Sequence, residues 1–153
     1  MTDCEKMEFA LRQAQLAAEL GEVPVGAAIF RGDTLITAAC NRRETDKSAL
    51  AHAEITAIGD ACRILGGWRL HECDLFVTLE PCPMCTGAII NARIRRVVFG
   101  AFDPKAGCLG SLCDLTALPV NHKPQVSGGV LAEQCGALLS GFFAGLRQAK
   151  RGK

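Results

Sequence analysis

No stretch of the 153-residue sequence approaches the roughly 20 consecutive apolar residues that a membrane-spanning helix needs. The first residues include acidic side chains and show no basic cluster followed by an apolar run, so they do not resemble a secretory signal. Internal repeats and low-complexity tracts are also missing. These absences exclude membrane and fibrous proteins and predict a cytoplasmic protein whose thiols stay reduced.

The net charge is small and aromatic residues are few. The 17 basic and 16 acidic residues leave a net charge of +1, without the overall basic character of many nucleic-acid binders. The chain has no tyrosine, which disfavours any base-binding site that depends on one. Because apolar residues make up 49% of the sequence, we expect one folded domain over residues 1–153.

The spacing of apolar residues and turn signals predicts alternating helices and strands. Thr2 and Glu5 form a capping box, and Arg31-Gly32-Asp33 is typical of a tight turn between two strands. The predicted order is a helix ending at Gly21, two strands within 25–40, a helix within 48–67, a strand at 74–79, a helix at 83–94, a strand at 95–101, a loop at 102–124, a short strand at 124–130 and a helix at 131–150. This order predicts an α/β fold in which helices cover a mixed sheet.

Nine cysteines are present, but only Cys82 and Cys85, in "LEPCPMC", form a C-x-x-C pair. Such a pair is a redox dithiol, half of a structural zinc site, or two ligands of a catalytic metal. A structural zinc site needs a second ligand pair at similar spacing, which the sequence does not offer. A catalytic metal needs a third ligand, a nearby carboxylate and an open position for water.

The segment "AHAE" supplies both missing groups, His52 and Glu54, at the start of the helix within 48–67. Cys82 and Cys85 lie at the start of the helix at 83–94, where unpaired N–H groups and the helix dipole stabilise thiolates. We expect both helix ends to face one crevice at the edge of the sheet. The pattern favours a catalytic metal site, and the dithiol remains the alternative.

These motifs also carry a resemblance to a known family. "HAE" followed by "PCPMC" is similar to the H-x-E and P-C-x-x-C signature of the zinc-dependent cytidine and deoxycytidylate deaminase superfamily. The segments "EVPVGA", "CNR", "TLEPCPMCTGAI" and "RRVVFGAFDPKAGCLGSL" resemble its branch of bacterial tRNA-specific adenosine deaminases. The resemblance implies a cytidine-deaminase-like fold, a three-layer α/β/α sandwich with a mixed central sheet. It also implies a single zinc-dependent deaminase domain over residues 1–153.

The chemistry that this resemblance implies is hydrolytic. One zinc ion per subunit is held by His52, Cys82 and Cys85 with water in the fourth position, and Glu54 is the catalytic proton carrier. The expected reaction converts adenosine to inosine at the wobble position of a tRNA anticodon. A free-base or nucleoside deaminase acting on guanine or cytosine is the alternative on the same fold.

The resemblance also implies contacts with the substrate. Asn41 is expected to hydrogen-bond the flipped base, Pro24 and Val25 to shape the pocket wall, and Asp103 and Lys105 to touch the RNA backbone and sugars. The tRNA anticodon loop is the expected partner. The basic residues available to support RNA binding are Arg42, Arg43, Arg93, Arg95, Arg96, Lys105, Arg147, Lys150, Arg151 and Lys153.

Two further expectations concern apolar residues on helices. Members of this branch are usually homodimers, and Ile89, Ile90 and Ile94 are candidates either for a dimer contact or for the core. In the helix within 48–67, the apolar spacing predicts a core-facing stripe. That stripe consists of Ile55, Ile58, Cys62 and Leu65.

Overall fold

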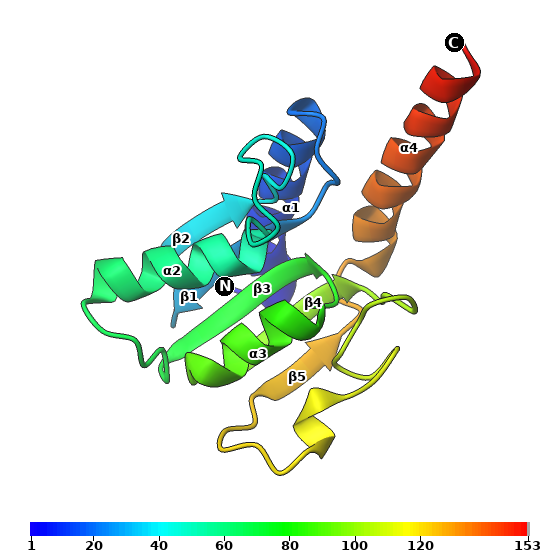
Figure 1. The fold of residues 1–153 in the computed structure, drawn as a ribbon. Coiled ribbons are helices and arrows are strands. Elements are labelled where there is room, and N and C mark those ends of the chain that lie inside the picture. Colours follow the sequence, from blue (N-terminus) through cyan, green and yellow to red (C-terminus); the bar gives the residue numbers. More distant parts are fainter. Residues whose placement is uncertain (153) are drawn as a thin grey trace.

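The computed structural model describes residues 1–152 and contains helices and strands in the predicted order (Figure 1). The elements are α1 (Asp3–Glu19), β1 (Gly26–Arg31), β2 (Thr34–Cys40), α2 (Ala53–Leu65), β3 (Cys73–Leu79), α3 (Pro83–Asn91), β4 (Arg96–Ala101), η1 (Leu115–Ala117), β5 (Gln125–Gly128) and α4 (Ala132–Arg151). The short 3-10 helix η1 lies within the segment predicted as a loop. None of the helices in the described part combines the length and apolar character that a bilayer crossing requires.

The strands form one mixed sheet in the order β2-β1-β3-β4-β5. β1 pairs antiparallel with β2 and with β3, whereas β3, β4 and β5 run parallel to one another. The β1–β2 connection is the predicted tight turn, with Gly32 at φ 60, a conformation that glycine adopts without steric cost. The carboxyl end of β3 leads directly toward α3, so the cysteine motif lies at this edge of the sheet.

Helices cover both faces of the sheet. Because adjacent strand residues point to opposite faces, Ile29 and Leu75 contact the α2 and α3 side, whereas Phe30 and Phe76 contact the α1 and α4 side. The predicted three-layer α/β/α sandwich is therefore confirmed. The C-terminal part of α4 extends beyond the other elements (Figure 1).

The core-facing stripe of α2 differs from the predicted one. Of the predicted residues only Ile58 is buried, and the fully buried positions beside it are alanines. They are Ala53, Ala57 and Ala61. Small side chains let the helix approach the sheet closely, so the larger Cys62 and Leu65 pack at the border of the core instead.

Ile89, Ile90 and Ile94 belong to the core rather than to a free surface. Their exposed fractions are 0%, 8% and 0%. Ile89 and Ile94 pack in the cluster between the sheet and the α2–α3 layer. These residues are therefore not available for a dimer contact.

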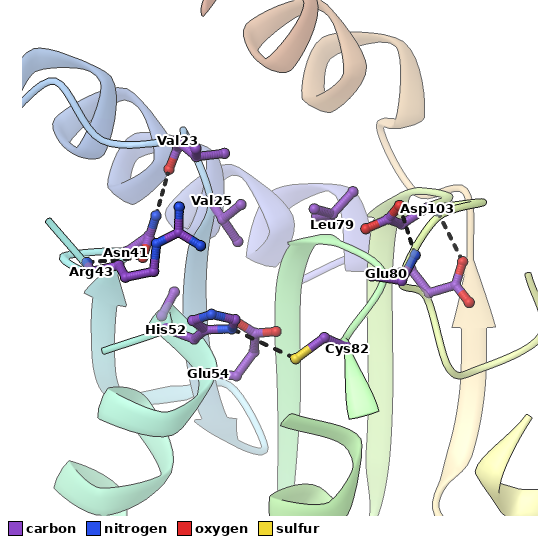
Figure 2. Close-up of a pocket in the computed structure, with 12 residues that line it drawn as sticks. Val23, Val25, Asn41, Arg43, His52, Glu54, Leu79, Glu80, Cys82 and Asp103 are labelled. Carbon is purple, nitrogen blue, oxygen red and sulfur yellow. Dashed lines mark hydrogen bonds between the residues drawn. The ribbon is translucent and has the colours of Figure 1, made fainter. Parts of the chain in front are cut away.

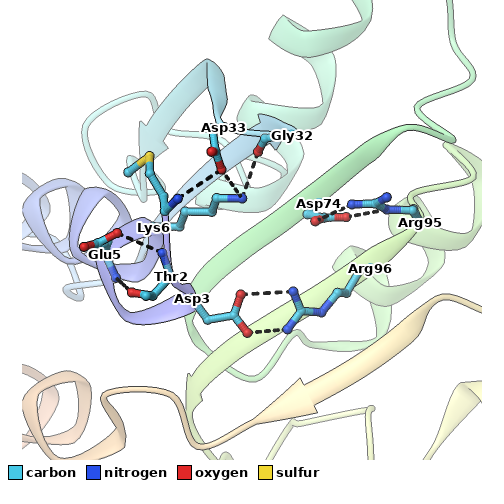
Figure 3. Close-up of polar contacts among 10 residues, drawn as sticks. Thr2, Asp3, Glu5, Lys6, Gly32, Asp33, Asp74, Arg95 and Arg96 are labelled. Carbon is cyan, nitrogen blue, oxygen red and sulfur yellow. Dashed lines mark hydrogen bonds and ion pairs between the residues drawn. The ribbon is translucent and has the colours of Figure 1, made fainter.

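Several of the basic residues expected to support RNA binding are instead paired with carboxylates (Figure 3). Arg95 binds Asp74 through two hydrogen bonds of 2.9 and 2.8 Å, and Arg96 binds Asp3 at the start of α1. Arg42 pairs with Asp46. Arginines held in this way by internal partners are poor candidates for phosphate contacts, and Lys153 lies outside the described residues.

The start of α1 is fixed by the predicted capping box. The Glu5 N–H donates to Thr2 Oγ1 at 3.1 Å, and the Thr2 N–H donates to Glu5 Oε2 at 2.8 Å (Figure 3). Lys6, which is 8% exposed, donates to the Gly32 carbonyl at 2.8 Å and pairs with Asp33. These contacts tie α1 to the β1–β2 turn.

Candidate active site

The N-termini of α2 and α3 meet beside the carboxyl end of β3 (Figure 2). His52 is the residue immediately before α2, and Cys82 is the residue immediately before α3. Pro83 occupies the first helical position of α3, where a missing N–H costs nothing, and Cys85 follows within the same first turn. Two helix starts, 30 residues apart in the sequence, thus bring an imidazole and two thiols together.

The three side chains have the spacing of a tetrahedral metal site. His52 Nδ1 lies 3.7 Å from Cys82 Sγ and 3.5 Å from Cys85 Sγ, and the three donor atoms lie within 4.8 Å of one another. Zinc bonded tetrahedrally to nitrogen and sulfur separates the two ligand atoms by about 3.6 Å. The donor set and its spacing fit zinc, with one tetrahedral corner left for a non-protein ligand.

The two cysteines differ in their tendency to lose a proton. A hydrogen bond from Cys85, followed by one from His52, lowers the pKa of the Cys82 thiol to about 4. The same pairing with Cys82, together with burial, raises the pKa of the Cys85 thiol. Cys82 is therefore the thiol of the pair that loses its proton more readily, as expected at a helix N-terminus.

Glu54 is a buried carboxyl group beside the potential ligands. It is 4% exposed, and burial raises its pKa, while the charge of His52 opposes that rise. A buried carboxyl whose pKa is raised holds a proton more readily than an exposed glutamate does, which suits a group that must both accept and release one.

Two of the potential ligands, His52 and Cys82, line one cavity together with Glu54 (Figure 2), and Cys85 is buried behind them. The lining residues come from the ends of β2 and β3, the starts of α2 and α3 and the loops around them. They are Val23, Val25, Asn41, Arg43, His52, Ala53, Glu54, Leu79, Glu80, Cys82, Asp103 and Ala106.

Three of the five predicted substrate contacts line this cavity: Asn41, Val25 and Asp103. Pro24 is buried and does not line it, and Lys105 lies at a separate groove beside α4. Arg43, which the sequence analysis named only among the basic residues available for RNA binding, lines the cavity, and so does Glu80, to which the sequence analysis gave no role.

The part of the chain that carries these residues matches a known family. A model of the cytidine and deoxycytidylate deaminase zinc-binding region matches residues 1–101, which include His52, Glu54, Cys82 and Cys85. The chain belongs to the cytidine and deoxycytidylate deaminase family. This membership excludes the redox-dithiol interpretation of the cysteine pair.

Individual relatives place this deaminase more narrowly. It is 49% identical to the tRNA-specific adenosine deaminase of Bacillus subtilis (strain 168), in a match covering 95% of this chain and 91% of the relative. It is 40% identical to a solved structure of a tRNA:A34 deaminase, with a TM-score of 0.84 over 88% of this chain and 99% of that one. A guanine deaminase structure from Nitrosomonas europaea is 29% identical, with a TM-score of 0.77 over 92% and 84%. The deaminase therefore falls in the tRNA-specific adenosine deaminase branch.

In this deaminase a second buried carboxylate organises one wall of the cavity. Glu80, 2% exposed, accepts hydrogen bonds from the N–H groups of Asp103, Leu109 and Ser111, each at 3.1 Å, and from the Ser111 hydroxyl at 2.5 Å. Burial alone would raise the pKa of Glu80, but these hydrogen bonds outweigh it and hold the pKa below its usual value. The loop that carries Asp103 is thereby folded around a single charge.

A third buried carboxylate organises the opposite wall. Glu22, 1% exposed, accepts the N–H of Glu44 at 3.0 Å and the N–H of Thr45 at 2.6 Å. Burial opposes ionisation, yet the hydrogen bonds from this loop lower the pKa of Glu22. Neither Glu22 nor Glu80 has a sequence signal beyond its place in the family motifs "EVPVGA" and "TLEPCPMC".

Proposed function

We propose that this chain is a single zinc-dependent deaminase domain over residues 1–153 that converts adenosine to inosine at the wobble position of a tRNA anticodon. One zinc ion per subunit would be held by His52 Nδ1 and by the Sγ atoms of Cys82 and Cys85. The observation that carries the proposal is the clustering of these three donor atoms beside a cavity that His52, Cys82 and the buried Glu54 line. The names of its relatives support the choice of adenosine in tRNA.

The chain's own residues account for the proton transfers. When bound, zinc acts as a Lewis acid and lowers the pKa of the water that it binds to about 7. Glu54 would take one proton from the attacking water and deliver it to N1 of adenine while the water oxygen bonds to C6. It would then move the second water proton to the C6 amine, whose bond to C6 breaks. Ammonia departs and the base becomes hypoxanthine.

The base is oriented by the opposite end of the cavity. The Asn41 Nδ2 group donates to the Val23 carbonyl at 3.2 Å, and Asn41 Oδ1 accepts the Arg43 N–H at 3.2 Å. A primary amide has two N–H groups and two acceptor lone pairs, so one of each remains for the base edge. Val25 supplies an apolar wall, and buried Pro24 acts from behind it.

The remaining contacts involve RNA outside the base pocket. Asp103 lies at the cavity edge, where we expect contact with the ribose of the target nucleotide. Lys105 faces a groove shared with α4, and we assign it to the RNA backbone beyond the target. The anticodon loop suits such a site because its bases are unpaired and can be turned out.

We also propose that the protein is cytoplasmic and forms a homodimer, as its similarity to tRNA-specific adenosine deaminases implies. A mass measurement in solution tests the homodimer, with a monomer mass contradicting it.

The decisive experiment replaces the proton carrier and leaves the ligands in place. Glu54→Gln should retain zinc by elemental analysis and lose about 10²- to 10⁴-fold in inosine formation on an anticodon stem-loop. The unsubstituted protein should be offered the stem-loop, free adenosine, guanine and cytosine in parallel. Deamination of guanine or cytosine in place of the stem-loop would favour a free-base deaminase, and full activity of Glu54→Gln would overturn the mechanism.

A further inference from the structure

The charges that line the cavity are unevenly distributed. Three carboxyl groups line it, those of Glu54, Glu80 and Asp103. Within the described part of the chain, Arg43 is the one lysine or arginine among the lining residues. An RNA substrate brings a phosphate on each side of the target nucleotide, and like charges at close range repel. A polynucleotide therefore needs a cation at this mouth, whereas a free base does not.

The backbone of Arg43 is held at three consecutive points. Its N–H donates to Asn41 Oδ1 at 3.2 Å, and its carbonyl accepts the Ser48 N–H at 3.0 Å. The next N–H, that of Glu44, donates to the buried Glu22 carboxylate at 3.0 Å. The loop position that presents Arg43 is thus fixed by the same network that places the base-contacting Asn41.

The guanidinium of Arg43 is free to exchange its partner. Its side chain is 53% exposed, and its ion pair with the 76% exposed Glu44 spans 3.7 Å. Exposed pairs of this kind contribute little, typically below about 1 kcal/mol. Figure 2 shows the side chain reaching past Asn41 on the His52 side of the cavity, opposite Asp103 and Glu80.

The neighbouring Arg42 provides a contrast within the same loop. Its Nε donates to both carboxylate oxygens of Asp46, at 3.1 and 3.3 Å, and it does not line the cavity. Arg42 and Arg43 share sequence context and charge, but only Arg43 has its guanidinium at the cavity mouth.

We propose that Arg43 binds a phosphate that flanks the target adenosine and thereby makes the site select RNA over free nucleosides and bases. The planar guanidinium offers paired N–H donors that match two phosphate oxygens. Arg43 is a specificity-determining residue in this reading, and the chemistry at C6 does not require it. The inference rests on the proposed function.

The test measures binding of an anticodon stem-loop to the full-length, zinc-loaded Glu54→Gln protein, in which turnover does not interfere. Adding Arg43→Ala should weaken binding about tenfold and lower the slope of log Kd against log salt by about 0.7, the value for one phosphate on a single strand. Arg43→Lys should keep the salt slope but recover only part of the affinity, since a lysine does not form the paired contact. Arg42→Ala, the matched control, should bind within about twofold of the parent.

Stem-loops with one neutral methylphosphonate linkage, placed either 5′ or 3′ of the target adenosine, identify the phosphate. One of these two neutral linkages should weaken stem-loop binding by the Glu54→Gln protein about tenfold. With that linkage, adding Arg43→Ala should cause no further loss of affinity. Equal losses for Arg42→Ala and Arg43→Ala, or an Arg43→Ala effect that persists with both neutral linkages, would overturn the inference.

If the unsubstituted protein forms no inosine in the normal stem-loop, the proposed function fails instead. If it forms inosine and Arg43→Ala keeps full affinity, only this inference fails.

Discussion

Two loops face each other across the cavity, and each is folded around one buried carboxylate. The loop after β2 directs two N–H groups, those of Glu44 and Thr45, at Glu22. The loop after β4 directs three N–H groups and one hydroxyl at Glu80. Both carboxylates are nearly inaccessible to solvent, so each loop depends on a charge that lies outside it in the sequence.

The two loops differ in how many hydrogen bonds they donate to their buried carboxylate, which we call the anchor of the loop. We name each loop after its anchor, the Glu22 loop and the Glu80 loop. Both oxygens of Glu80 accept two donors, whereas each oxygen of Glu22 accepts one backbone N–H. The Glu80 loop also approaches its anchor so closely that only glycine fits at position 107. We conclude that the Glu80 loop is a rigid wall, while the Glu22 loop fixes the backbone at Arg43 and leaves the Arg43 guanidinium exposed at the cavity mouth.

The largest effect is expected from filling the space between the Glu80 loop and its anchor. In Gly107→Ala the added Cβ would lie 2.3 Å from Glu80 Cδ and 2.6 Å from the Asp103 carbonyl, so the anchor itself must shift. We expect a loss of about 3 kcal/mol in unfolding free energy and at least about tenfold in inosine formation. Urea denaturation and the stem-loop assay measure these.

A matched glycine supplies the control for that prediction. Gly136 lies in α4 and has no atom within 4 Å of the position that a Cβ would take. Gly136→Ala should be neutral or stabilising, by up to about 1 kcal/mol, because alanine is the better helix former. If Gly107→Ala were as stable as Gly136→Ala, the rigid-wall description would be wrong.

Replacing Glu80 by its amide tests the charge rather than the space. In Glu80→Gln the amide nitrogen replaces one oxygen, so at least one backbone N–H of the loop loses its acceptor. An unsatisfied buried donor costs about 1–3 kcal/mol, and we expect about 2 kcal/mol here, with a severalfold loss of activity. Thermal unfolding and single-turnover rates check this. Unchanged zinc content would locate the effect in the loop rather than in the metal site.

The sequence predicted correctly those features of the fold and the site that depend on rules acting over a few residues. The turn at Arg31-Gly32-Asp33 needs a positive φ at glycine, and the structure has one at Gly32. The H-x-E and P-C-x-x-C spacing was enough to predict that His52, Cys82 and Cys85 come together, because each lies at a helix start. Rules of this kind act over a few residues and are visible in the sequence.

The sequence did not predict features that depend on contacts between residues far apart in the chain. Glu22 and Glu80 are ordinary acidic residues in the sequence, and only the fold shows that loops 20 to 30 residues away converge on them. Arg42 and Arg43 are adjacent and alike, yet Asp46 holds one while the other faces the cavity. The partner of a charged side chain is a tertiary property, so no periodicity reveals it.

The Glu22 loop should respond more weakly to the same chemical change. Glu22→Gln removes the acceptor of one N–H, and the adjacent side chains are more exposed than those at Glu80, so we expect about 1 kcal/mol of destabilisation. The effect on function should exceed that on stability, because Asn41 and Arg43 would lose their fixed positions. Stem-loop affinity should fall several-fold while zinc content stays constant. A larger loss of stability than in Glu80→Gln would reverse the ranking of the two loops.

The smallest expected effect is a change in how the free energy of unfolding depends on pH. In both glutamates the hydrogen bonds hold the pKa of the folded state below that of an unfolded glutamate, about 4.3. Their contributions are therefore complete above about pH 4.3 and are lost as the pH falls through the lower pKa of the folded state. Each unit of difference is worth about 1.4 kcal/mol. Denaturation midpoints between pH 7 and pH 3 should fall less steeply in Glu80→Gln and in Glu22→Gln than in the unsubstituted protein. Because all three proteins share the metal ligands, protonation at zinc cancels in the comparison, and equal slopes would show that neither carboxylate is charged in its loop.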